Sequence, residues 1–217
     1  MKKSILSCLL TMVLIVAIGT PFALAAGSNE MKQQRETEHF VFFCTDQDAK
    51  ALDDLEASFE GCYDRVTSHL GVTPPGKTRV NVYPDIQSFH NAVGRPNDPD
   101  WSVGEARNGM IYMTSPLNPG PEHTYDNIII TAVHEFVHIV INQFHRSQPS
   151  YLNEGLASYE AGQDGGGVYD IQMDMRSNTL PSLTTLQTMG SFSSIQSQYN
   201  VYTYGPASLL AALTKSS

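Results

Sequence analysis

Cysteine is scarce in this chain, since only three of its 217 residues are cysteines. So few thiols exclude a small domain held together by several disulfides. Charged residues are also few, at 16%, whereas 41% of the residues are hydrophobic and 9% are aromatic. This composition excludes a disordered chain, which is rich in charge and poor in aromatic residues. We therefore expect one folded domain with a core of ordinary size.

Basic residues are the other scarce class. The chain has 13 lysines and arginines against 22 aspartates and glutamates, and no run of basic residues occurs. An acidic surface repels the phosphate groups of nucleic acids. The sequence therefore predicts no nucleic-acid partner.

Residues 1–25 have the pattern of a secretory signal peptide. Two lysines precede an apolar run over residues 5–18, and the Ala-Leu-Ala sequence at 23–25 offers a small-residue cleavage site. A membrane anchor is the less favoured alternative, because Gly19 and Pro21 interrupt the apolar run before it reaches about 20 residues. We expect an exported protein, secreted or located in the periplasm or cell envelope, without stable membrane insertion after cleavage.

Cys44 and Cys62 remain after cleavage. An exported protein allows a disulfide between them. However, Cys44 ends a strand-like run and Cys62 lies well inside the helix expected next, so roughly 20 Å or more would separate them at about 1.5 Å per residue. We expect two buried thiols.

The hydrophobic pattern predicts helices and strands without a strict β-α-β alternation and without an internal repeat. Residues 26–37 are polar and are expected to form a flexible lead, whereas residues 38–217 should form one α+β domain. Strands are expected at 39–44, 78–83, 104–108 and 109–114, and helices at 52–70, from 85 onward, at 126–144 and at 205–213.

The segment 126–144 is apolar on all sides, which is typical of a helix buried in the middle of a domain. It contains His134, Glu135 and His138. Two histidines four residues apart share a helix face and can bind one zinc ion, and the glutamate beside them can take a proton from the metal-bound water. The alternatives are core histidines or a chance match, which arises about once in a hundred sequences of this composition. Burial favours a metal, because a divalent cation offsets the desolvation of these groups.

A catalytic zinc site needs a third protein ligand. Glu154 is the candidate, because its neighbours Leu152 and Leu156 are apolar and look packed; the alternative is a solvated helix residue. The pattern with a third downstream histidine is excluded, because Ile141 and Phe144 stand where it requires glycine and histidine.

The two motifs together, at 134–138 and 151–157, resemble the gluzincin zinc metallopeptidases. They are most similar to small exported peptidases of the MA-like superfamily that carry a Trp-Leu-x-Glu-Gly-Leu-Ala segment. The resemblance covers roughly residues 38–213 and departs from the family in having Tyr151 in place of tryptophan. It implies a zincin-like fold, in which a small mixed sheet packs on the active-site helix and a helical part follows.

The resemblance implies roles for individual residues. His134, His138 and Glu154 would bind one Zn²⁺ per chain, and Glu135 would be the general base. The family usually has a tyrosine near the start of a late helix, which stabilises the oxyanion; Tyr204 is favoured for this role and Tyr202 is the alternative.

Two further expectations come from the same resemblance. The strand at 109–114 would border the cleft and could pair with an extended peptide. Family members commonly continue with further helix, so a domain truncated at its C-terminus is an open alternative.

The sequence thus predicts a secreted zinc metallopeptidase that acts on a peptide or protein substrate. The alternative is a non-catalytic exported binding domain that retains the zincin scaffold. Glu135 favours the enzyme, because a binding module needs no acid beside a metal-bound water. The pattern specifies neither the cleavage preference, nor endo- versus exopeptidase action, nor the oligomeric state.

Overall fold

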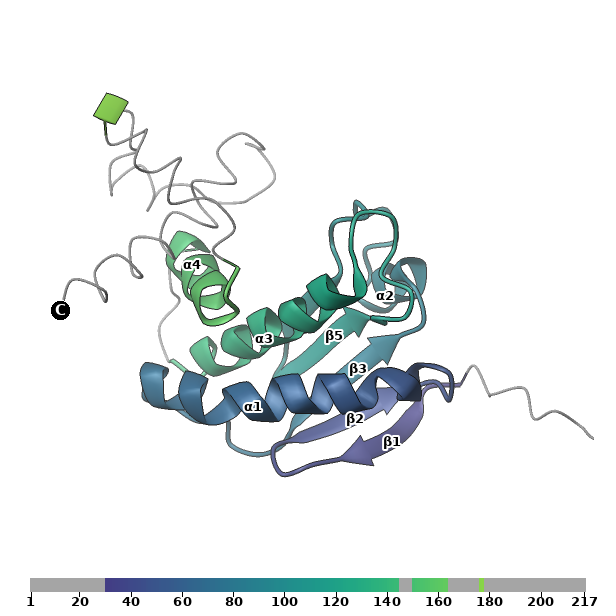
Figure 1. Cartoon of the computed structure of the whole chain (residues 1–217), viewed down its shortest axis with the longest axis horizontal. Coiled ribbons are helices and arrows are strands. Elements are labelled where there is room, and N and C mark those ends of the chain that lie inside the picture. The colour runs from purple at the N-terminus through teal and green to yellow at the C-terminus, as the bar shows by residue number, and fades with distance from the viewer. Residues whose placement is uncertain (1–29, 145–149, 164–175, 178–217) are drawn as a thin grey trace, which may run out of the picture.

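A computed structural model describes residues 30–144, 150–163 and 176–177 of the chain (Figure 1). This part forms one five-stranded mixed sheet and four α-helices, which confirms the α+β class. The strands are β1 (Lys32–Glu36), β2 (Phe40–Cys44), β3 (Thr78–Tyr83), β4 (Gly104–Arg107) and β5 (Met110–Thr114). A short 3-10 helix (Asp48–Ala51) precedes the helices α1 (Leu52–Leu70), α2 (Ile86–Ala92), α3 (Tyr125–Ile141) and α4 (Ser150–Glu160).

Several expected features lie outside the described residues. These are the signal peptide at 1–25, the helix at 205–213 and the end of the domain. Within the part that is described, none of the helices is both long and apolar enough to cross a membrane.

The sheet has the strand order β1-β2-β3-β5-β4. The three central strands are parallel to one another, and the edge strands β1 and β4 are antiparallel to their neighbours. α1 and α3 lie side by side across one face of this sheet (Figure 1). Alternation along the central strands directs their buried hydrophobic side chains into the core with these helices. The strand residues of this core are Phe40, Phe42, Cys44, Val80, Val82, Ile111 and Met113.

An aromatic cluster joins the two helices to the sheet. The ring of Phe40 on β2 lies 4.8 Å from Phe59 of α1 and 5.1 Å from Phe136 of α3, measured between ring centroids. Tyr63 of α1 stacks on Phe136 at 5.4 Å. Aromatic pairs at these distances add to the stability gained from burying their area. The cluster therefore sets how α1 and α3 sit on β2.

The expectation of a flexible lead at 26–37 is wrong for residues 32–36, because they form β1. This strand pairs antiparallel with β2. Its side chains are exposed or half-buried, so it lacks the hydrophobic alternation that identifies a strand in a sequence. Backbone hydrogen bonds and ion pairs hold it instead, such as Arg35 Nη1 to Glu56 Oε2 at 2.8 Å.

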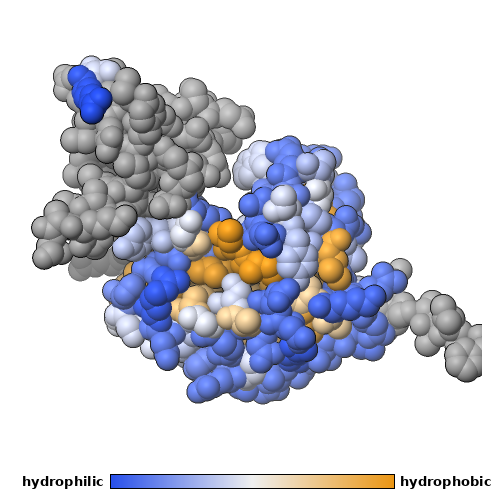
Figure 2. All heavy atoms as spheres, in the orientation of Figure 1, coloured by the Kyte–Doolittle hydropathy of each residue, from blue (hydrophilic) through white to orange (hydrophobic). Residues whose placement is uncertain are grey.

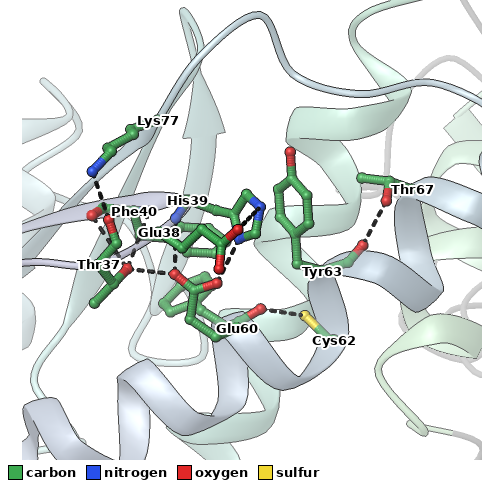
Figure 3. Close-up of polar contacts among 10 residues, drawn as sticks. Thr37, Glu38, His39, Phe40, Glu60, Cys62, Tyr63, Thr67 and Lys77 are labelled. Atoms are coloured by element: carbon green, nitrogen blue, oxygen red, sulfur yellow. Dashed lines mark hydrogen bonds and ion pairs between the residues drawn. The ribbon is translucent and has the colours of Figure 1, made fainter.

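The turn between β1 and β2 is fastened to α1 by Glu60 (Figure 3). The Glu60 carboxylate accepts hydrogen bonds from the Thr37 hydroxyl, from the backbone N–H of His39 at 2.9 Å and from its Nδ1 at 2.6 Å. Burial alone would raise the pKa of Glu60, but these hydrogen bonds lower it. The His39 ring also stacks on Tyr63 at 3.5 Å. The carboxylate therefore stays charged and anchors the start of β2.

Two turns have the conformations that their residues predict. Gly71 ends α1 in the left-handed region, with φ of 69°. Asn108 and Gly109 connect β4 to β5, both with positive φ (54° and 73°), as a two-residue hairpin with an Asn-Gly turn requires.

The expectation of two free, buried cysteines is confirmed, and it predicts their reactivity. Cys44 and Cys62 are 0% and 4% exposed, and burial raises the pKa of each thiol to about 12. Because the thiolate is the reactive form, we expect neither to react with Ellman's reagent at pH 8 in the folded protein. Both should react at once in concentrated urea, as the absorbance of the released dye will report. Rapid reaction in the folded protein would contradict the buried placement.

Candidate metal centre

The rotation of α3 aims its histidines away from the sheet. The helix begins at a capping box, in which Thr124 and Asn127 exchange side-chain to backbone hydrogen bonds. Phe136 is fully buried in the aromatic cluster, on the side of α3 that packs on the sheet. Since residues four apart share a helix face, His134 and His138 lie together on another side of the helix. There they meet α4, which packs on α3.

Three possible ligand atoms converge between α3 and α4. The distance from His134 Nε2 to His138 Nε2 is 3.0 Å. Glu154 Oε2 lies 3.2 Å from the first of these nitrogens and 3.5 Å from the second. The three residues expected as ligands are thus brought together as a group that could hold a metal ion.

The other ring nitrogen of each histidine has an amide partner. His134 Nδ1 lies 2.8 Å from Gln163 Oε1, and His138 Nδ1 lies 2.9 Å from Asn153 Oδ1. An amide oxygen only accepts, so each Nδ1 carries the hydrogen and each neutral ring keeps a lone pair on Nε2. Two lone pairs and a carboxylate at such short distances repel one another unless a cation lies between them. The hydrogen bonds therefore prepare both rings to bind a cation.

Without a metal, a proton on His138 relieves part of the repulsion between the two imidazoles and the Glu154 carboxylate. Burial alone would lower the pKa of His138, but the hydrogen bond and charge of Glu154, with Glu135 nearby, raise it to about 9. Burial alone would raise the pKa of Glu154, but the two imidazoles hold it far below its usual range. The metal-free site therefore contains an imidazolium and a carboxylate at neutral pH.

Glu135 lies beside this group and against β4. It is 7% exposed, and burial raises its pKa, an effect that the neighbouring imidazoles partly offset. A Cβ added at Gly104 would lie 2.8 Å from Glu135 Oε1 and 2.9 Å from Thr131 Cγ2. Only a glycine at the start of β4 leaves room for this carboxylate.

Gln163 reaches the site because of the way in which α4 ends. Gly162 has a φ of 70°, and its N–H bonds to the carbonyl of Tyr159, while the N–H of Gln163 bonds to that of Ser158. This is a Schellman motif, which turns the chain back over the helix. The sequence analysis missed the roles of Gln163 and Asn153. Gly162 as a helix-ending glycine was the available signal for the first.

Two expectations from the resemblance, the oxyanion tyrosine and the peptide-pairing strand, are not met by the described residues in the same way: the first lies outside them and the second is wrong. Tyr204 and Tyr202 lie outside the described residues. The strand at 109–114 cannot pair with a peptide, because β5 is flanked by β3 and β4 and both of its edges are occupied. The hairpin folds β4 outward, so among the described strands β4 is the edge beside α3 and Glu135.

We expect Gly104→Ala to destabilise the fold by about 1–3 kcal/mol, because the added methyl group collides with Glu135 and Thr131. Gly61→Ala is the matched control, since its Cβ meets nothing within 4 Å in the middle of α1. It should stabilise the fold by about 1 kcal/mol. Urea unfolding measures both. Equal effects of the two substitutions would contradict the close approach of β4 to Glu135.

The raised pKa of His138 predicts how the stability of chelator-treated protein depends on pH. A folded pKa of about 9, above the ordinary 6.5, contributes stability that is complete below pH 6.5 and is lost as pH rises through 9. We therefore expect the free energy of unfolding to fall over this range. Glu154→Gln, which removes the charged partner, should flatten the fall. An unchanged pH profile in that variant would contradict the pairing.

No family model, curated protein or solved structure matches the chain.

Proposed function

We propose that the protein is a secreted zinc metallopeptidase of the gluzincin type with a zincin-like fold. His134, His138 and Glu154 would bind the zinc ion, and Glu135 would act as the general base. The observation that carries this proposal is the convergence of two Nε2 atoms and one carboxylate oxygen, with both Nδ1 atoms already hydrogen-bonded.

The spacing of the three atoms suits zinc. Ligands at about 2.0–2.1 Å in a tetrahedron lie about 3.3 Å from one another, and the three distances here run from 3.0 to 3.5 Å. Imidazole nitrogens favour zinc over calcium or magnesium, which prefer oxygen ligands. Two histidines and one glutamate leave the fourth position of a tetrahedron for water, as in catalytic zinc sites.

The chain's own residues support hydrolysis. Bound zinc supplies a Lewis acid and lowers the pKa of a water toward about 7. Glu135 lies next to the ligands, where its carboxylate can accept a proton from the attacking water and later donate it to the leaving amine. Burial raises the pKa of Glu135, which makes its carboxylate a stronger proton acceptor. Tyr204 remains the proposed oxyanion donor.

A peptide substrate would lie along β4. This edge strand borders Glu135, and the backbone groups of its outer edge can pair with an extended chain. Hydrophobic surface gathers over α3, whereas the surface of α1 is mostly hydrophilic (Figure 2). Ile130 of α3, one turn before His134, is 36% exposed. This surface fits a peptide that carries an apolar side chain.

Metal content tests the ligands. The parent protein should contain one zinc ion per chain by elemental analysis, and His138→Ala and Glu154→Ala should lose most of it. Glu122→Gln, an exposed residue before α3, is the control and should keep it. A folded, zinc-supplemented parent without zinc would contradict the proposal and leave the histidines a structural role.

Hydrolysis of an unfolded protein such as casein tests the general base. Glu135→Gln should keep the zinc and lose at least about 100-fold in rate, because the amide cannot accept the proton. Glu122→Gln changes the charge equally and should keep the parent rate. Parent-like hydrolysis by Glu135→Gln would refute the assigned role. A zinc-loaded parent without hydrolysis of any peptide would favour the non-catalytic binding domain.

A further inference from the structure

The far end of α4 is fastened to α1 by a buried carboxylate. The Glu160 side chain is only 3% exposed. Its carboxylate contacts the Arg65 guanidinium, and the Nη2 atom of the same arginine donates to the Glu160 backbone oxygen at 2.8 Å. His69 Nδ1 lies 2.9 Å from the other carboxylate oxygen. Arg65 and His69 are four residues apart, so they present these groups from one face of α1.

The residues that α4 and its C-terminal turn contribute to the metal centre lie on the helix held in this way or follow its held end. Asn153 and Glu154 stand about two turns before Glu160, and Gln163 follows three residues after the helix end. At 1.5 Å per residue, about 9 Å of regular helix separates Glu154 from Glu160. A shift of the Glu160 end along or around the helix axis therefore carries Glu154 with it.

An ion pair of this kind fixes position more than it adds stability. Desolvation of a buried carboxylate consumes much of the gain from its partner, so the net contribution to stability is small. The arginine, however, binds both the carboxylate and the backbone oxygen of one residue. This two-point contact permits only one register of α4 against α1.

We propose that Arg65 is a positioning residue for the metal centre. Through Glu160, and with support from His69, it sets the register of α4 and so places Glu154 at the distance from His134 and His138 that a metal requires. This inference rests on the proposed zinc site and assigns to α1, which supplies no ligand, control over metal affinity.

The test compares the zinc affinity of the full chain and its variants by competition with a chromophoric chelator. Arg65→Met should weaken zinc binding about 10- to 100-fold, the range typical of lost contacts behind metal ligands. Arg35→Met is the matched control: Arg35 also joins an element to α1, and its ion pairs within the described residues are with Asp53 and Glu56 of α1. It should change the affinity less than about threefold, even where its urea midpoint falls as far as that of Arg65→Met.

A second, milder variant keeps the test valid if Arg65→Met fails to fold. Arg65→Lys keeps a positive charge beside Glu160 but cannot contact the carboxylate and the backbone oxygen together. It should bind zinc less tightly than the parent and more tightly than Arg65→Met. Parent-like affinity in both folded variants would overturn the inference.

A third measurement separates this inference from the proposed function. In metal-free protein, hydrogen exchange of the α4 amides should accelerate at least about tenfold in Arg65→Met and stay unchanged in Arg35→Met. A parent that binds no zinc would defeat the proposed function alone, since the exchange result would still decide whether Arg65 holds α4. Equal exchange in all three proteins would overturn the positioning role.

Discussion

The rotation of α3 about its own axis determines what its two histidines can do, and the burial of Phe136 fixes that rotation. The ring packs against Phe40 and Tyr63, which belong to the sheet and to α1. Turning the helix would expose Phe136 and drive both imidazoles into the apolar core, where they would find no polar partner. Hydrophobic packing on one side of α3 therefore stabilises the orientation of the polar groups on the other.

The two helices of the candidate metal centre are held in different ways. α3 is fixed by the core, whereas α4 combines apolar packing, with Ala157 fully buried, and polar contacts: the amide partners of the histidines and the ion pair of Glu160. Hydrogen bonds weaken steeply when their geometry changes. A small shift of α4 therefore disturbs the polar contacts of the candidate site.

Hydrophobic spacing along the sequence predicted the helices and strands that pack directly on the core. The three- and four-residue spacing in α1 and the alternation in β3 arise from the contact of each element with the core, so the sequence displays them. The two histidines of α3 were predictable from their spacing, because residues four apart share a helix face. β1 escaped prediction because backbone pairing and ion pairs hold it, and a polar edge strand shows no hydrophobic alternation.

Contacts between segments far apart in the chain could not be predicted from local sequence patterns. β4 and β5 are similar short strands, and which of them becomes the sheet edge depends on the pairing of β5 with β3. Arg65 and Glu160 are 95 residues apart. A charged residue on a helix is usually solvated, so nothing in the local sequence distinguishes these two from surface residues.

Two ligands on α3 and one on α4 would make a bound ion a covalent-like cross-link between separate helices. The two cysteines of the described part are both buried and unpaired, so they provide no such link. An ion that binds only the folded chain adds its binding free energy to the stability of the fold. For this chain, the metal would then serve the role that disulfides serve in small secreted domains, with the difference that the strength of the cross-link follows the metal concentration of the surroundings.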